Sequence, residues 1–456
     1  MSITDACLKT KIQSNINAIT SNCCSQAFVQ ETNAITSATS DRQISIATAN
    51  DLPDLLTNYI SPGQTVYVES LQSLMTTDGF SWYGLDGRKF RQDASEKILY
   101  VWGKNSNGQL GDGTTTSRSS PVTTAAGGND WKLVAISSNN NNHALAIRSD
   151  NKLWGWGINS CGQLGNNTII GTCSPIIISN DSWAAIAVSG RGSSAGVKTD
   201  GTLWTWGRNY CGILGDGTTT SRSSPGTIAG GGTNWSSISF GYDHSSAIKT
   251  DGTLWTWGRS SSGVLGSGNY TNRSSPGTTA GGGTNWCQSS SSYRNTAAIK
   301  TDGTLWTWGR NNCGQLGDGT TTVRQSPVTT AGGGTNWCKI SAGVSHMSGI
   351  KTDGTLWTWG INNCCQLGDG AGGYGIKKSS PGTTAGGGTN WCVASAGCYH
   401  SAGVKTDGTL WTWGGGTGGA LGIGSNSNRS IPTQISLSNW SFVVAGECNT
   451  AAIRTF

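Results

Sequence analysis

The sequence contains few of the residues that form catalytic sites or membrane-spanning segments. Charged side chains make up 12% of its 456 residues, and there are only four histidines, nine prolines and three methionines. The longest apolar runs fall short of the roughly 18 residues that a membrane-spanning helix needs, so no membrane span is expected. The start of the chain is polar and lacks the apolar core of a secretion signal, so none is expected.

Basic charge is sparse and unevenly distributed. Residues 1–97 contain 7 Lys and Arg against 10 Asp and Glu, whereas residues 98–456 contain 23 against 14. Nucleic-acid-binding proteins usually carry denser basic patches than this. We therefore expect no nucleic-acid partner.

Glycine and tryptophan, by contrast, are abundant, with 69 Gly and 21 Trp. A chain with so many large apolar rings to bury is not expected to be a disordered low-complexity protein. The mixture is typical of short strands that are joined by tight turns.

A W-x-W-G signature recurs along the chain, and successive copies are 50 to 54 residues apart. Such a period indicates a repeat architecture of seven units. Tyr100 replaces the first Trp in the first copy. The second Trp of the signature, which we expect to be structural, recurs at Trp102, Trp156, Trp206, Trp257, Trp308, Trp359 and Trp413.

One unit predicts four strands. Residues 246–250 run into Asp251-Gly252, a tight-hairpin signal, and residues 253–258 then alternate with period two. A polar loop leads to Ser275-Pro276, after which a short strand is expected, and a fourth strand begins near Trp286. Seven four-stranded units predict an all-β, seven-bladed propeller.

The two ends of the repeat region complete each other. The chain ends in residues 451–456, which match the strand before an Asp-Gly turn, whereas the first signature, residues 98–103, lacks such a partner. We therefore predict that the N- and C-terminal strands pair and close the ring, which removes open sheet edges. The predicted domains are residues 1–97 and a propeller of residues 98–456.

The same residues carry a family resemblance. The segments Trp306–Asp318 and Gly241–Gly252 contain W-T-W-G, N-x-x-G-Q-L-G-D and H-S-x-A-I-K-T-D-G. They resemble the regulator-of-chromosome-condensation repeat, and the resemblance extends over residues 98–456. It implies the propeller fold but no single activity, because the loops of a propeller determine its function.

Catalytic chemistry is not indicated. His143, His244, His346 and His400 each lie 13 residues before the second Trp of their repeat. They could form a ring of metal ligands, but repetition in separate blades favours a structural hydrogen bond. The aspartates recur in turns and loops, where they accept backbone hydrogen bonds. We therefore predict no enzyme, no catalytic residues, no metal and no cofactor.

Cysteines recur at equivalent repeat positions, as at Cys161, Cys211, Cys313 and Cys364. Equivalent positions lie a blade apart, beyond the reach of a disulfide. Small buried thiols are therefore predicted.

Basic residues are the only candidate binding features. One set recurs beside the hairpin turns, and a second follows the Trp-Gly pair of the signature. They could bind acidic polysaccharide, phosphate or a protein, or they could be ordinary solvated charges. The second set, together with two lysines of the irregular loop 371–378, gives the candidate surface residues: Lys104, Arg208, Arg259, Arg310, Lys377 and Lys378.

The first 97 residues are predicted to be a small helix-then-β module. Residues 1–45 show a weak helical spacing, which would need partners such as other copies of the chain, so a homo-oligomer is one expectation. Residues 46–95 are predicted to be β-rich. Residues 51–55, 63–69 and 82–88 resemble a short module of marine bacteriophage structural proteins.

That second resemblance implies a function. It predicts a non-enzymatic structural or adhesive protein of a phage virion, in the fibre, spike or decoration class. Residues 1–97 would bind other virion proteins, and the propeller would bind a host surface glycan or protein. The alternative is a cytoplasmic protein-interaction propeller that regulates a small GTPase, and an unusual enzyme comes third.

Overall fold

The computed structural model describes residues 96–137, 142–385 and 387–456, together with the backbone of five short strands between residues 44 and 90. The chain divides into two compact units, Met1–Ser95 and Glu96–Phe456. Residues 1–43 of the predicted helix lie outside the described residues, and Ile44 and Ser45 belong to strand β1 (Ile44–Ile46). The structure describes no side chain of residues 1–95, so it does not test the binding to virion proteins that was predicted for residues 1–97.

The N-terminal unit contains one five-stranded sheet in the order β1-β2-β3-β4-β5. β1 and β2 are parallel, and the other neighbours are antiparallel. The strands are β1 (Ile44–Ile46), β2 (Thr65–Val68), β3 (Ser73–Thr77), β4 (Trp82–Gly84) and β5 (Lys89–Phe90).

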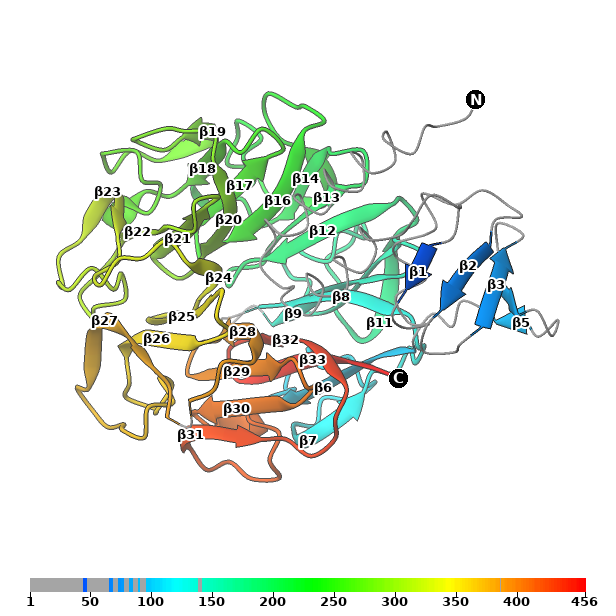
Figure 1. Ribbon diagram of the computed structural model, residues 1–456. Coiled ribbons are helices and arrows are strands. Elements are labelled where there is room, and N and C mark those ends of the chain that lie inside the picture. Colours follow the sequence, from blue (N-terminus) through cyan, green and yellow to red (C-terminus); the bar gives the residue numbers. More distant parts are fainter. Residues whose placement is uncertain are drawn as a thin grey trace. The chain divides into compact units, whose positions relative to one another are not determined.

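The second unit is a seven-bladed propeller of four-stranded antiparallel sheets, as predicted (Figure 1). The inner strand of each blade contacts its counterpart in both neighbouring blades, which forms a ring around the axis. The inner strands are β8 (Trp131–Ile136), β12 (Trp183–Val188), β16 (Trp235–Phe240), β20 (Trp286–Ser291), β24 (Trp337–Ala342), β28 (Trp391–Ala396) and β32 (Trp440–Ala445).

Three further strands complete each blade. The second strands are β9 (His143–Arg148), β13 (Ser193–Lys198), β17 (His244–Lys249), β21 (Asn295–Lys300), β25 (His346–Lys351), β29 (His400–Lys405) and β33 (Asn449–Thr455). The third strands are β10 (Leu153–Gly157), β14 (Leu203–Gly207), β18 (Leu254–Gly258), β22 (Leu305–Gly309), β26 (Leu356–Ile361), β30 (Leu410–Gly414) and β6 (Lys97–Gly103). The outer strands are β11 (Thr172–Ser179), β15 (Arg222–Thr227), β19 (Arg273–Thr278), β23 (Arg324–Thr329), β27 (Lys377–Thr383), β31 (Arg429–Gln434) and β7 (Arg118–Thr123).

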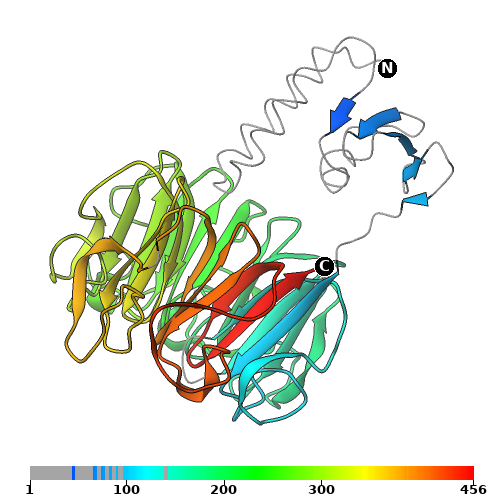
Figure 2. The ribbon, with the colours of Figure 1, turned by 60° about the horizontal axis from the view of Figure 1, so that its bottom comes forward.

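The predicted closure of the ring is present. β33 pairs with β6 in an antiparallel register that runs from Asn449 opposite Gly103 to Thr455 opposite Lys97. Figure 2 shows β33, in red, beside β6 at the start of the propeller. One blade is thus built from both ends of the propeller sequence.

The outer strand differs from its prediction. We expected a strand after Pro276, but Pro276 lies inside β19. Proline has no N–H to donate, and an outer edge strand has no neighbour that needs one on its solvent side. The proline therefore also protects the edge of the blade from pairing with another chain.

Tryptophan packing joins each blade to the next. The second Trp of every signature is fully buried. In the blade of β18, the Trp257 indole N–H donates to the carbonyl of Ile213 in the preceding blade at 2.8 Å. Gly215 lies so close to that indole that a Cβ on it would be 2.6 Å from Nε1, and its φ is +70°. This position of the loop therefore requires glycine.

The antiparallel order gives the propeller two faces. On one face, named here the loop face, lie the connections from inner to second strands and from third to outer strands. On the other, named the turn face, lie the Asp-Gly hairpins between second and third strands and the links between blades. The cations beside the hairpin turns therefore lie on the turn face, whereas the six candidate surface residues lie on the loop face.

Candidate interaction surface

The histidines are structural. His244 Nε2 lies 2.9 Å from the hydroxyl of Thr296, which belongs to the next blade. Burial lowers the pKa of His244 from 6.5 to about 3, so the ring is neutral. The other three make the equivalent contact across blades: His143 with Ser194, His346 with Ser401 and His400 with Thr450. The bond ties neighbouring blades rather than strands of one sheet.

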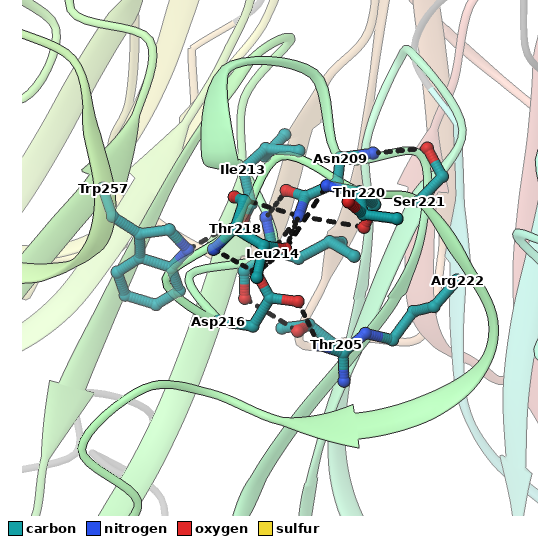
Figure 3. A network of polar contacts seen from close by, with 10 residues as sticks. All are labelled: Thr205, Asn209, Ile213, Leu214, Asp216, Thr218, Thr220, Ser221, Arg222 and Trp257. Carbon is teal, nitrogen blue, oxygen red and sulfur yellow. Dashed lines mark hydrogen bonds and ion pairs between the residues drawn. The ribbon is translucent and has the colours of Figure 1, made fainter.

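The aspartates of the long loops hold those loops together (Figure 3). Asn209 Nδ2 donates to Asp216 at 3.1 Å, and Asn209 Oδ1 accepts from the N–H of Leu214 at 3.0 Å. Arg222, the first residue of β15, forms an ion pair with Asp216. Burial alone would raise the pKa of Asp216, but hydrogen bonds from Thr218 and Arg222 outweigh it and hold the pKa below its ordinary value.

In the blade of β26, the equivalent loop network contains one of the predicted surface residues. Lys378 pairs with Asp369 and stands where Arg222 stands in its own blade. The Lys377 ammonium donates to the carbonyl of Asn312 in the neighbouring blade at 3.3 Å.

The basic ring beside the hairpin turns is held by tryptophan. The Lys300 ammonium lies 4.9 Å from the Trp286 ring centroid and 4.6 Å from that of Trp306. Such cation–π contacts stabilise the charge on the protein's own rings. Five further blades place their cation in the same way, at Arg148, Lys198, Lys249, Lys351 and Lys405. On the turn face, each of these six cations is therefore already bound to tryptophan rings of its own blade.

The four cysteines that recur at one equivalent position of the repeat are free thiols, as predicted, but they are partly exposed rather than buried. They are Cys161, Cys211, Cys313 and Cys364.

Three of the predicted residues lie on the loop face of neighbouring blades. Arg208, Arg259 and Arg310 follow the third strands of three adjacent blades. Lys104 follows β6 in the closing blade, where its N–H donates to the carbonyl of Cys448. Lys104 is thus separated from the three arginines.

Around these arginines the structure assembles residues that the sequence did not single out. The Arg191 guanidinium lies 4.4 Å from the Tyr242 ring centroid and 4.9 Å from that of Tyr210. Tyr242 in turn packs on Tyr293 at 4.6 Å between ring centroids. We name the group the Arg/Tyr cluster; its members are Arg191, Arg208, Tyr210, Tyr242, Asp243, Arg259, Tyr293, Arg294 and Arg310.

One buried carboxylate serves this cluster. Asp243 lies 3.3 Å from Arg191 and 3.4 Å from Arg259. Both distances are longer than a strong charge-assisted hydrogen bond, and Oδ1 of Asp243 has no hydrogen-bond partner. Desolvation raises the pKa of Asp243, although the nearby arginines oppose it. The carboxylate is therefore held loosely between two guanidinium groups.

The cluster gives the loop face an asymmetry. At the two positions before the second strand, the cluster blades carry Arg191, Tyr242-Asp243 and Tyr293-Arg294, whereas other blades carry Val344-Ser345 and Cys398-Tyr399. We did not single out these positions from the sequence. The signal was the divergence of these two positions while the residues around them repeat.

Within the described residues, no helix is long and apolar enough to cross a membrane. In the same part of the chain, no group of three or more His, Cys, Asp or Glu side chains could hold a metal ion.

The fold and its repeats define a closed, seven-bladed β-propeller that is built from one recurring sequence unit. Two profiles described as the regulator of chromosome condensation (RCC1) repeat match more than half of the chain. The first matches residues 98–146, 200–248, 302–349 and 407–453, and the second matches residues 133–163, 235–264 and 287–315. The chain therefore belongs to the RCC1 repeat family.

Known relatives agree with this assignment. The chain is similar to the ultraviolet-B receptor UVR8 of Arabidopsis thaliana, with 29% identity over 74% of this chain and 77% of that protein. It is also similar to the mitochondrial RCC1 domain-containing protein RUG3 of the same plant, with 28% identity over 78% of this chain and 75% of that protein.

Solved structures share the fold. Yeast RCC1 (Prp20) bound to Kap60 matches with a TM-score of 0.70 and 19% identity, over 79% of this chain and 89% of that one. Human WBSCR16 matches with a TM-score of 0.65 and 19% identity, over 78% and 98%. At this identity the likeness shows the fold alone.

The comparisons contradict the virion hypothesis. The relatives are eukaryotic RCC1-type proteins and not phage structural proteins. The predictions of a phage fibre, spike or decoration protein and of a virion location are therefore wrong. The short motifs of residues 51–88 misled us because they cover little of the chain, whereas the repeats cover most of it. The findings favour the alternative, an interaction propeller.

Proposed function

We infer that the chain is a non-catalytic, intracellular protein-binding propeller whose loop face holds a partner protein at the Arg/Tyr cluster. The observation that carries this is the concentration of five arginines and three tyrosines on three adjacent blades. Arginine and tyrosine are enriched at protein interfaces because they combine contact area with directed hydrogen bonds. The other blades lack this combination at the equivalent positions.

The contrast between the two faces supports the loop face. On the turn face the repeated cations already lie on tryptophan rings of their own blades. On the loop face, Tyr210 is 41% exposed and lies within 6.0 Å of both Arg208 and Arg259. Partly exposed aromatic rings beside cations are suited to form the centre of an interface.

The relatives support a protein partner. A study of Prp20p from Saccharomyces cerevisiae describes its binding to Gsp1p and histones, and another structure holds Prp20 with Kap60. The mitochondrial relative RUG3 supports a place of action inside the cell. Regulation of a small GTPase stays a prediction.

Partner capture with matched charge variants tests the proposal. The full chain serves as bait in an extract of its source cells, beside the double variant R208E/R259E. A control, K132E/K152E, makes the same charge change on the turn face, where Lys132 is exposed and Lys152 is 40% exposed. We expect a partner that the wild type and the control capture equally and that R208E/R259E captures at least about tenfold less. Equal capture by R208E/R259E would contradict the proposal.

A further inference from the structure

We propose that the Arg/Tyr cluster recognises an acidic peptide segment of the partner, whose carboxylates compete with Asp243 for the arginines. This inference rests on the proposed function and adds the chemistry of the ligand. The cluster contains five guanidinium groups and one carboxylate. None of Arg208, Arg294 and Arg310 forms an ion pair with any residue in the described part of the chain.

The arginines are pre-positioned to bind carboxylates. Arg191 is held between Tyr210 and Tyr242, and Arg294 lies 5.2 Å from the Tyr293 ring centroid. Stacking holds the plane of a guanidinium and leaves its N–H edge available for a bidentate bond. Less conformational entropy is then lost when an acidic ligand binds.

Asp243 shows that the site accepts a carboxylate. It bridges Arg191 and Arg259, which come from adjacent blades, at 3.3 and 3.4 Å. A ligand carboxylate that approaches from solvent can make shorter bonds to the same arginines. Asp243 would then act as an internal competitor that weakens the binding of acidic ligands.

The size of the cluster favours a peptide over a nucleic acid. Nucleic-acid surfaces track many phosphates with an extended basic groove. The cations of the Arg/Tyr cluster come from three adjacent blades, and hairpin cations of the opposite face lie on tryptophan rings. A short acidic segment with a few carboxylates matches this extent.

Fluorescence anisotropy with the full chain tests the inference. The probes are labelled deca-glutamate and a labelled oligothymidylate of similar charge. We expect deca-glutamate to bind more tightly, with an affinity that falls as salt increases. R208Q/R294Q should weaken it by at least about tenfold, whereas D243N should tighten it by about threefold, because the internal competitor is removed.

A matched control separates the site from net charge. R273Q/R429Q removes two positive charges outside the cluster, where Arg273 and Arg429 donate to exposed backbone carbonyls. We expect its affinity to equal that of the wild type. Equal losses in the two double variants, a folded D243N that binds no tighter, or tighter binding of oligothymidylate would each overturn the inference. Circular dichroism checks folding, and R208Q/R294Q remains decisive if D243N does not fold.

The two proposals fail in different ways. If R208E/R259E loses its captured partner but deca-glutamate does not bind the wild type, the loop face remains the interface and the acidic-segment inference is wrong. If R208E/R259E keeps its partner, the proposed function itself is wrong.

Discussion

At the scale of the residue, the histidines show how one neutral side chain links two blades. The hydroxyl of Thr296 donates its only proton to the Val264 carbonyl at 2.9 Å. It therefore accepts from His244, whose proton must be on Nε2. Protonating His244 would place a positive charge in a fully buried site, which desolvation opposes.

This burial predicts a loss of stability in mild acid. The pKa is about 3 for His244 and His346 and about 4 for His400, against 6.5 in an unfolded chain. As the pH falls below 6.5, the unfolded state binds protons that the folded state excludes. The free energy of unfolding should therefore fall by up to about 1.4 kcal/mol per pH unit for each histidine until the folded pKa is reached.

The variant H244N separates this effect from other acid effects. Asn295 occupies the same repeat position in the next blade, so asparagine fits there. We expect H244N to be about 1 kcal/mol less stable at pH 7, because the bond between blades is lost. Urea unfolding between pH 7 and pH 4.5 should give H244N a shallower loss of stability than the wild type. Parallel curves would show that His244 does not titrate on unfolding.

At the scale of the element, side-chain hydrogen bonds hold a long loop in its conformation. Asn209 donates to Asp216 and to the carbonyls of Thr218 and Thr220, so one amide spans the loop. The blade of β19 replaces this network with Ser260 and Ser267, and its Arg273 donates instead to the Thr278 carbonyl. Backbone geometry is thus kept across blades even where the network is reduced.

Removal of the loop carboxylate should therefore cost stability only where the network exists. D216A removes one acceptor of the buried Asn209 amide and the ion-pair partner of Arg222, and we expect it to lower the free energy of unfolding by about 1–3 kcal/mol. S267A changes the equivalent position of the next blade, where Ser267 makes only an exposed contact with Asn269, and should change it by less than about 0.5 kcal/mol. Urea unfolding at pH 7 compares the two. Equal losses would mean that the loops do not depend on this network.

At the scale of the whole molecule, the sequence predicted the architecture but not the interaction surface. The seven signatures from Trp102 to Trp413 predicted seven blades. Each blade contributes one such tryptophan, whose indole reaches the loop of the preceding blade. The Arg/Tyr cluster was missed in part because Arg191, Tyr242 and Arg294, about 50 residues apart, occupy the two repeat positions before the second strand, at which the residue type differs from blade to blade. Only the curvature of the ring brings such positions together, and a repeat pattern records what blades share rather than how they differ.

Ring closure makes the stability of the propeller depend on its last strand. β33 pairs with both β32 and β6, and Thr450 accepts the hydrogen bond of His400. A chain that ends at Cys448 would expose the edges of β32 and β6 and leave the buried Leu99 and Val101 uncovered. Because all seven blades are joined in one ring, we expect the whole propeller to lose stability.

Truncation tests this dependence. The chain that ends at Cys448 should melt at a lower temperature than the full chain, and its tryptophan emission should shift to longer wavelength as the buried indoles meet water. A control that lacks only Phe456, a residue that is 50% exposed, should melt within a few degrees of the full chain. A synthetic peptide of residues 449–456 should restore part of the lost stability by adding the missing strand to the open edges. An unchanged melting temperature without β33 would mean that the blades are stable without closure, and each blade would then have to be stabilised by its own core.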